Sequence, residues 1–392
     1  MRKTTAKTAA QQPDWDEAEL AAVIEELRSR APLVDAGSCH ALRGELEVVA
    51  RGEAFVIQGG DCAEPFADSA APRVQRKAAL LDVLGDLVEH VAGLPVVRVG
   101  RLAGQYAKPR SSPTETGADG TVLPVYRGDA VNDPAPEPGA RRADARRLLR
   151  AYDHAATALD ALFLNQFLLP TAGLSPTYVS HEALLLDFER ALVRPDGLRG
   201  GWYGSSGHML WIGERTRQLD GAHLEFAATV NNPVGVKIGP TATADDVAAI
   251  IELLAGGHRA GRLTLIVRMG ARTIGTALPL LLTGLGHRAR DVVWLCDPMH
   301  GNTVRSASGR KTRVVSDVAA EVEAFCAVLR AHGVYPGGLH LELTPDDVTE
   351  CVDTHDRLAV DDFPRFESAC DPRLDGEQAE RVVRLAAELL RR

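Results

Sequence analysis

Residues 58–64 (QGGDCAE) combine a thiol, two carboxylates and a glycine pair directly after the apolar run at 54–57. Glycines after a strand let the backbone turn sharply and approach a ligand. Asp61, Cys62 and Glu64 therefore lie where they can supply ligand or acid/base atoms. A lone cysteine at a strand end is more often a small buried hydrophobe. A functional role for this stretch is therefore supported only if similar stretches occur elsewhere in the chain.

Such stretches occur near the other end of the chain, where three side chains follow further strand-like runs: His300, Glu342 and Asp371. Together with Cys62 they offer a thiolate, an imidazole and two carboxylates. This mixture of soft and hard donors suits a divalent transition ion such as Mn²⁺, Co²⁺, Fe²⁺ or Zn²⁺, whereas Mg²⁺ matches a thiolate poorly. The alternative for any one of them is a satisfied core histidine or a solvated carboxylate.

Cationic side chains form a second set with the same placement. They follow strand-like runs or lie in the adjoining loop, at Arg101, Lys108, Arg110, Arg215, Lys237 and Arg268. Most lysines and arginines are simply solvated, but Lys237 and Arg268 adjoin apolar strands. Converging cations suit phosphate and carboxylate groups, so we expect anionic substrates.

Eight apolar runs with strand character supply the elements that would position these side chains. They lie at 54–57, 95–100, 176–180, 209–212, 234–238, 263–267, 292–295 and 338–342, with helical patterns between most of them. Eight strands alternating with helices favour an α/β fold of the closed parallel (β/α)8 TIM-barrel type over an open doubly wound sheet. Because the active site of such a barrel forms at the C-terminal ends of its strands, residues that follow the runs become neighbours.

The barrel prediction leaves two segments outside the regular alternation, within one barrel domain over 1–392. Residues 1–50 form an N-terminal extension, with a frayed arm to about residue 12 and an amphipathic helix at 16–30. Residues 103–175 form an inserted loop and helix segment after the second strand, with a helix from about 141 to 167. A long irregular connection of this kind is disordered or functional. We also expect Thr243 and Ser316 to cap helices.

Composition and short motifs exclude several classes of protein. A hydrophobic content of 45% and a charged content of 25% are typical of an ordinary soluble globular protein, and a net charge of −9 argues against a nucleic-acid partner. Six cysteines without a Cys-x-x-Cys pair indicate a reducing cytoplasm. The N-terminus is not a secretory signal, and no apolar run reaches the ~20 residues that span a bilayer. Nucleotide-binding glycine motifs are missing from the sequence.

Five motifs together resemble the class II (plant and actinobacterial type) 3-deoxy-D-arabino-heptulosonate 7-phosphate (DAHP) synthases. They are QGGDCAE at 58–64, GRLAGQYAKPRS at 100–111, WIGERTR at 211–217, CDPMHGNT at 296–303 and CDPRL at 370–374. The resemblance runs from about residue 11 to about residue 384. The family opens the shikimate pathway of aromatic amino acid and chorismate biosynthesis, and relatives serve secondary metabolism.

The resemblance implies specific roles for the residues of these motifs. Metal ligation falls to Cys62, His300, Glu342 and Asp371, with Mn²⁺ or Co²⁺ foremost and Fe²⁺, Zn²⁺ or Cd²⁺ as alternatives. Phosphoenolpyruvate binding falls to Arg101, Trp211, Glu214, Lys237 and Arg268, of which Arg101, Glu214 and Lys237 are also catalytic candidates. Erythrose 4-phosphate binding falls to Lys108, Pro109, Arg110, Ser111 and Arg215.

The implied reaction condenses phosphoenolpyruvate with D-erythrose 4-phosphate and water to give DAHP and phosphate. An amino-DAHP synthase that uses an imino-erythrose 4-phosphate is the alternative, and a silent scaffold subunit is a third reading from outside enzymology. The resemblance further implies a cytoplasmic homodimer or higher homo-oligomer, without a membrane partner. Residues 201–208 depart from the family pattern, which we expect to affect the wall of the sugar-phosphate site.

Cys370 directly precedes the proposed ligand Asp371, so a fold that brings Asp371 to Cys62 also brings Cys370 near. We therefore expect the metal-free protein to form a reversible disulfide between Cys62 and Cys370. Bound metal would protect both thiols, because the Cys62 sulfur would already be engaged as a thiolate ligand.

Overall fold

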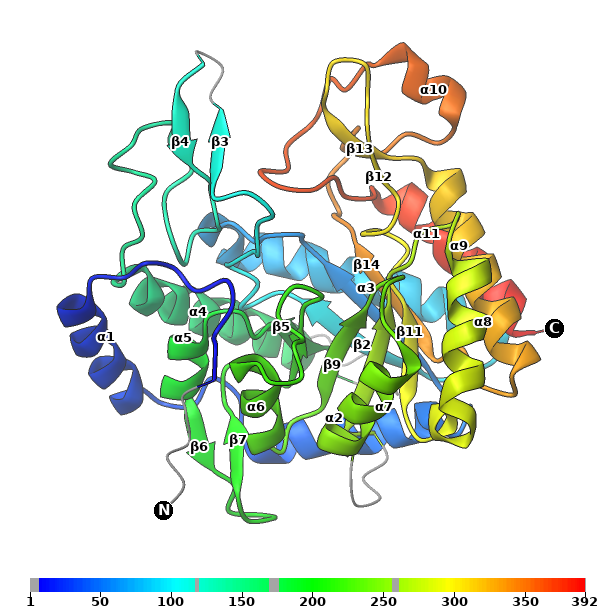
Figure 1. Ribbon diagram of the computed structural model, residues 1–392, viewed down its shortest axis with the longest axis horizontal. Coiled ribbons are helices and arrows are strands. Elements are labelled where there is room, and N and C mark those ends of the chain that lie inside the picture. The colour runs from blue at the N-terminus through cyan, green and yellow to red at the C-terminus, as the bar shows by residue number, and fades with distance from the viewer. Residues whose placement is uncertain (1–6, 117–119, 169–175, 256–260, 392) are drawn as a thin grey trace.

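The computed structural model describes residues 7–116, 120–168, 176–255 and 261–391, and its centre is a closed barrel of parallel strands (Figure 1). Around the barrel the strand order is β1, β14, β11, β10, β9, β8, β5 and β2. Their bounds are Phe55–Gly60 (β1), Val96–Arg101 (β2), Tyr178–Glu182 (β5), Met209–Ile212 (β8), Val234–Ile238 (β9), Leu263–Val267 (β10), Val293–Cys296 (β11) and Gly338–Glu342 (β14). Each strand overlaps one predicted apolar run, so the (β/α)8 prediction is confirmed.

The barrel strands are buried and mainly apolar because both of their faces are covered. Side chains that point inward, among them Val56, Val99 and Trp211, share one cluster with Leu42 and Leu46 of helix α2 (Ala36–Ala50). Helix α2 therefore closes the N-terminal end of the barrel, at the bottom of Figure 1. This helix was not predicted, because its glycines lower helix propensity and its stability comes from packing against the barrel.

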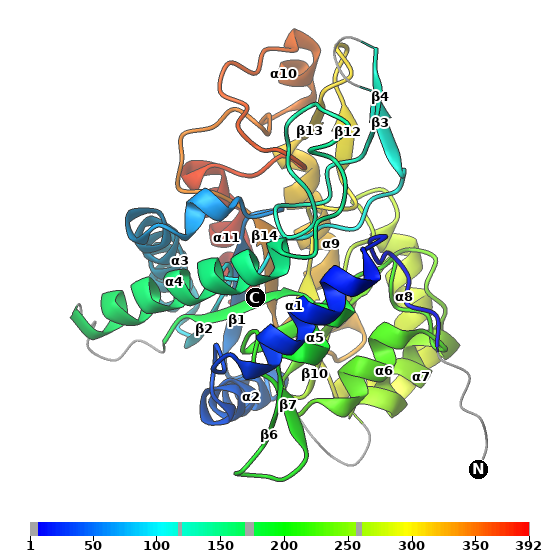
Figure 2. The same cartoon turned by 90° about the vertical axis from the view of Figure 1, so that its left-hand side faces the viewer.

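The outward faces of the strands are covered by a ring of helices. Neighbouring helices pack on one another from α5 through α9, and α11 packs against both α9 and α3 (Figure 2). The bounds are Ala71–Ala92 (α3), Leu186–Ala191 (α5), Ala222–Thr229 (α6), Ala244–Ala255 (α7), Ile274–Leu285 (α8), Val315–Ala331 (α9) and Gly376–Leu390 (α11), with short 3-10 turns at Phe66–Ser69 (η1) and Gly286–Arg290 (η2).

One of the two predicted helix caps is present. The hydroxyl of Thr243 accepts a hydrogen bond from the Asp246 N–H at 3.1 Å, and the Thr243 N–H donates to the Asp246 carboxylate at 3.3 Å. The prediction for Ser316 is wrong, since helix α9 begins one residue earlier and has no side-chain cap. Its first N–H groups donate to the carbonyls of Val352 and Asp353 instead, at 2.8 and 3.2 Å.

The inserted segment between β2 and β5 contains the antiparallel hairpin of β3 (Thr114–Thr116) and β4 (Val122–Pro124), followed by helix α4 (Arg147–Leu168). Helix α4 packs against α3 and against α1 (Glu17–Ser29). It begins later than predicted. Residues 117–119 and 169–175 of this segment lie outside the described residues.

The described part of the N-terminal arm, from residue 7 onward, is bound to the body and not frayed as predicted. The Gln12 side chain donates to the Leu184 carbonyl at 2.8 Å and accepts from the Leu186 N–H at 3.0 Å. The Gln11 side chain accepts from the Arg110 N–H at 3.0 Å. Residues 1–6 lie outside the described part of the chain.

Three irregular excursions stand together at one end of the barrel: the β3–β4 hairpin, the hairpin of β12 (Thr303–Arg305) and β13 (Lys311–Arg313), and helix α10 (His355–Val360) (Figures 1 and 2). The hairpin of β6 (Val193–Pro195) and β7 (Trp202–Gly204) lies at the opposite end. No described helix is long and apolar enough to cross a membrane.

Candidate active site

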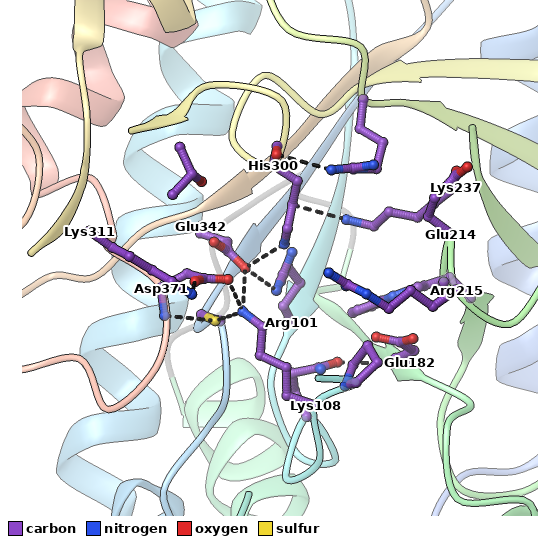
Figure 3. Close-up of a pocket in the computed structure, with 17 residues that line it drawn as sticks. Arg101, Lys108, Glu182, Glu214, Arg215, Lys237, His300, Lys311, Glu342 and Asp371 are labelled. Atoms are coloured by element: carbon purple, nitrogen blue, oxygen red, sulfur yellow. Dashed lines mark hydrogen bonds and ion pairs between the residues drawn. The ribbon is translucent and has the colours of Figure 1, made fainter. Parts of the chain in front are cut away.

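A cavity of about 200 Å³ opens at the C-terminal ends of the barrel strands. Every barrel strand contributes to its lining, either from its own last residues or from the loop that follows it. In chain order the lining includes Cys62, Arg101, Gln105, Lys108, Pro109, Glu182, Trp211, Gly213, Glu214, Arg215, Lys237, Arg268, His300, Thr303, Lys311, Glu342 and Asp371 (Figure 3). The structure thus brings together the residues proposed as metal ligands and most of those proposed for the two substrates.

Two predicted residues lie apart from this cavity. Arg110 and Ser111 line a second cavity of about 710 Å³ instead. The Arg110 guanidinium lies 3.5 Å from the Glu115 carboxylate. The prediction that residues 201–208 shape the sugar-phosphate site is not supported, because none of them lines either cavity. That segment leads into β8 from its N-terminal end, away from the mouth.

The proposed metal donors converge on one side of the cavity. Donor atoms of Cys62, Glu342 and Asp371 all lie within 4.8 Å of one another. His300 reaches the same group, with its Nε2 atom 3.1 Å from the Glu342 Oε1 atom. The loops after β1 and β11, the last residue of β14 and the segment before α11 therefore bring a thiol, an imidazole and two carboxylates to one point.

Lys108 provides a test of whether these donors suit a cation. Its Nζ atom forms hydrogen bonds with Cys62 Sγ and Asp371 Oδ2 and lies 3.9 Å from Glu342 Oε1 (Figure 3). The ammonium group thus takes the position among three donors that a bound cation would take. The donor set fits a divalent transition ion, since the thiol contributes a soft ligand and the carboxylates contribute hard ones.

The surrounding charges favour ionised carboxylates. Burial pushes the pKa of Glu342 upward, but His300, Lys108 and Arg313 outweigh burial and hold that pKa well below its ordinary value. Burial likewise pushes the pKa of Asp371 upward, but the neighbouring Lys108 ammonium opposes burial, and the pKa of Asp371 is lowered. Burial raises the pKa of the Cys62 thiol, and a hydrogen bond with Cys370 raises it further. A bound metal ion would favour the thiolate form of Cys62.

The cations proposed for phosphoenolpyruvate adjoin the donor set in the same cavity. Lys237 pairs with the buried Asp297 carboxylate at 2.5 Å, and Arg101 pairs with Glu342 at 3.1 Å while its guanidinium lies 5.2 Å from the Trp211 ring centre. Burial lowers the pKa of Lys237 to about 8, although Asp297 opposes the shift. Arg268 donates to the His300 carbonyl at 3.0 Å.

Two glutamates line the cavity in addition to Glu342, and they differ in how their oxygens are used. Glu214 accepts from the Gly239 N–H at 2.7 Å and from Arg217 at 2.8 Å, so both of its oxygens are engaged. Glu182, in contrast, has a buried Oε1 atom without a hydrogen-bond partner among the described residues. Burial raises the pKa of Glu182, and Lys237 is the strongest of the cations that oppose this shift.

Asp61 and Glu64 were predicted as possible ligand or acid/base groups, and this prediction is wrong for both. Their carboxylates turn away from the cavity toward Lys77 of helix α3, at 2.5 Å from Asp61 and 3.8 Å from Glu64. Arg373 approaches Asp61 from the other side at 2.7 Å. These groups form a buried ionic network behind the loop that carries Cys62.

Several polar groups of the site were not predicted. Glu182 ends β5 in the same way that Glu342 ends β14, so its place at a strand end was an available signal. Lys311 pairs with Asp371 at 2.8 Å from the β12–β13 hairpin. Asp297 lies within the CDPMHGNT motif, whereas His340 points into the barrel from the middle of β14. Selecting residues that end or follow a strand, as was done for the other site residues, does not select His340.

Fold and site together define an enzyme of the (β/α)8-barrel class with a cationic cavity beside a mixed thiol, imidazole and carboxylate donor set. The model of the Class-II DAHP synthetase family matches residues 1–167 and 169–387. The chain therefore belongs to the Class-II DAHP synthetase family.

Named relatives agree with this assignment. A phospho-2-dehydro-3-deoxyheptonate aldolase from Streptomyces coelicolor is 45% identical, covering 98% of this chain and 95% of the relative. A phospho-2-dehydro-3-deoxyheptonate aldolase from Mycolicibacterium smegmatis is 38% identical, covering 98% of this chain and 93% of the relative. A solved structure of such an aldolase from Francisella tularensis superposes with a TM-score of 0.54 over 99% of each chain at 13% identity, which supports the fold alone.

Proposed function

We propose that this chain condenses phosphoenolpyruvate with D-erythrose 4-phosphate and water to give DAHP and phosphate. The observation that carries the proposal is that one cavity, lined from every barrel strand, brings a group of cationic side chains next to a mixed donor set. The relatives named phospho-2-dehydro-3-deoxyheptonate aldolase support it, because they match over nearly the whole chain.

The cations of the cavity would hold the two anionic substrates. Arg101, Lys237 and Arg268 suit the phosphate and carboxylate of phosphoenolpyruvate, because several charged donors converge within one buried space. Lys108 and Arg215 would bind the phosphate end of erythrose 4-phosphate. Holding both substrates in register removes part of the entropic cost of a two-substrate reaction.

The mixed donor set would hold a divalent transition ion, for which Cys62, His300, Glu342 and Asp371 supply the ligands. The family resemblance favours Mn²⁺ or Co²⁺ as this ion. When bound, such an ion would act as a Lewis acid toward the aldehyde oxygen of the sugar phosphate. Lys108 would leave the donor set at the same time, which frees its ammonium group for the sugar phosphate.

Proton transfer falls to the glutamate whose oxygen is free. C3 of phosphoenolpyruvate attacks the aldehyde carbon, and water then adds at C2 before phosphate leaves. Glu182 would accept a proton from that water, since its Oε1 atom has no partner among the described residues and burial raises its pKa above the ordinary value, which makes it a stronger base. Glu214, with both oxygens engaged, would orient neighbouring groups.

A direct assay tests the proposal. The metal-reconstituted protein is mixed with phosphoenolpyruvate, with and without erythrose 4-phosphate, and released phosphate is measured while the sugar product is identified by mass. We expect phosphate release that requires both substrates and a product of the mass of DAHP. Phosphate release that does not depend on erythrose 4-phosphate would contradict the proposal.

A further inference from the structure

A buried histidine contacts two of the cations that line the cavity. His340, in the middle of β14, has no solvent exposure and makes an edge-to-face contact with Trp211 at 5.2 Å between ring centres. It lies outside the lining of the cavity and therefore does not reach a substrate. Both of its ring nitrogens nevertheless have close polar neighbours.

The hydrogen bonds on one side of the ring have a fixed direction. The Gly100 carbonyl can only accept, so the Ser180 hydroxyl at 3.0 Å donates to it. Ser180 Oγ then accepts from the Gln58 amide nitrogen at 3.0 Å, which leaves the Gln58 oxygen facing His340 Nδ1 at 2.7 Å. His340 Nδ1 must therefore carry the ring proton, because the Gln58 oxygen cannot donate.

The other ring nitrogen is consequently an acceptor. Arg101 Nη1 lies 2.5 Å from His340 Nε2, and Lys237 Nζ lies 2.9 Å from the same atom. Arg101 and Lys237 carry like charges, so their close approach is unfavourable unless a shared acceptor lies between them. Glu342 and Asp297 each bind only one of the two cations at 3.1 and 2.5 Å, whereas His340 binds both.

We infer that His340 is a positioning residue that joins Arg101 and Lys237 into one anion-binding unit through its Nε2 lone pair. The relay from Gly100 through Ser180 and Gln58 keeps that lone pair directed at the two cations. The inference rests on the proposed function in one respect, which is that the anion bound by the unit is phosphoenolpyruvate. A histidine that only filled the barrel would have no need of this relay.

Titration calorimetry with phosphoenolpyruvate tests the inference on the purified full-length protein. His340→Leu removes the acceptor and should weaken binding about 10- to 100-fold, the range expected for a hydrogen bond to a charged group. His340→Gln keeps an amide oxygen for the cations and an N–H for Gln58, so it should retain most of the affinity. Gln58→Leu, which breaks the relay without touching a cation, should weaken binding to an intermediate extent.

Thr264→Val is the matched control, since Thr264 is also buried in the barrel and its hydroxyl has no partner among the described residues. It should bind phosphoenolpyruvate like the wild type. Steady-state kinetics adds a second readout, because the KM for phosphoenolpyruvate should rise in His340→Leu while the KM for erythrose 4-phosphate stays unchanged.

The outcomes separate the inference from the proposed function. If a folded His340→Leu variant binds phosphoenolpyruvate with the affinity of the wild type, the inference is wrong and the proposed function is unaffected. If His340→Leu fails to fold, the Gln58→Leu variant tests the inference instead. Wild-type affinity for phosphoenolpyruvate in Gln58→Leu would show that the relay does not support binding. A wild-type protein that does not bind phosphoenolpyruvate would overturn the proposed substrate and the inference together.

Discussion

Arg373 donates from its guanidinium to the carboxylate of Asp61 at 2.7 Å, and this buried ion pair joins the two loops that carry Cys62 and Asp371. Glu350 holds the other side of Arg373 at 2.8 Å and accepts from the N–H of Ser368 at 2.8 Å. The backbone around Asp371 is thus anchored to the residue that precedes Cys62. The distance between two proposed metal ligands depends on side chains that do not themselves face the cavity.

Asp61→Asn should lower the free energy of unfolding by about 1.5 to 3 kcal/mol, the range for a hydrogen bond to a charged group. Lys77 and Arg373 lose the carboxylate that they share, and each keeps one other close partner, Asp68 at 2.9 Å and Glu350 at 2.8 Å. Denaturant unfolding measures this change. Asp347→Asn is the matched control, since Asp347 pairs with Arg365 at the same 2.7 Å but is 82% exposed. That exposed pair should contribute at most about 1 kcal/mol, and equal losses in the two variants would refute a special role for Asp61.

Metal removal should abolish the activity. Exhaustive chelation is expected to stop phosphate release, and Mn²⁺ or Co²⁺ should restore it, because the Cys62, His300, Glu342 and Asp371 donors fit such an ion. The cobalt-loaded protein should show a thiolate-to-cobalt absorption band that Cys62→Ser lacks. Full activity after complete metal removal would rule out the metal assignment.

The sequence alone could predict the barrel and most of the site, for a reason visible in particular residues. Strands of a closed parallel barrel are apolar on both faces, so runs such as 263–267 stand out, and residues at their ends, such as Glu342, must meet at one mouth. Side-chain direction is not specified in this way. Asp61 turns to Lys77 of a helix instead of the cavity, and Lys108 reaches into the metal donors, because partners distant in the sequence decide both.

Arg268→Ala should weaken phosphoenolpyruvate binding, whereas Arg215→Ala should act mainly through erythrose 4-phosphate. Each loss of a charge-assisted contact is expected to cost about 1.5 to 3 kcal/mol at the substrate that the arginine serves. Direct binding titrations with each substrate measure the two effects separately. Identical changes toward both substrates in both variants would contradict this division of the cavity.

Glu182→Gln should alter the pH dependence of the rate. Burial raises the pKa of Glu182 above its ordinary value, and a base acts only when ionised. As the pH is lowered, the rate of the wild type should therefore begin to fall at a higher pH than it would if the base were a carboxylate with an ordinary pKa. Glu182→Gln should remove this acidic limb and lower kcat about 10²- to 10⁴-fold, whereas Glu214→Gln should keep the limb. An unchanged acidic limb in Glu182→Gln would exclude Glu182 as the base.

The two thiols at Cys62 and Cys370 should oxidise to a disulfide in the metal-free protein. Their side chains are hydrogen-bonded, and this bond lowers the pKa of Cys370 to about 7 against the opposing effect of burial, with further help from Lys108. Cys370 can thus supply a thiolate near neutral pH, while Cys62 remains a thiol. Because the thiolate is the reactive form, oxidation should become faster as the pH rises through about 7.

Peptide mapping under non-reducing conditions, after exposure of the metal-free protein to air, measures this disulfide. We expect a Cys62–Cys370 peptide pair, its absence from protein loaded with Mn²⁺, and slower loss of metal-restorable activity in Cys370→Ser than in the wild type. Cys296, buried and distant in sequence from both, serves as an internal control that should stay reduced. If both thiols stay free in the wild type, or if Cys370→Ser loses activity equally fast, Cys370 only packs beside the site.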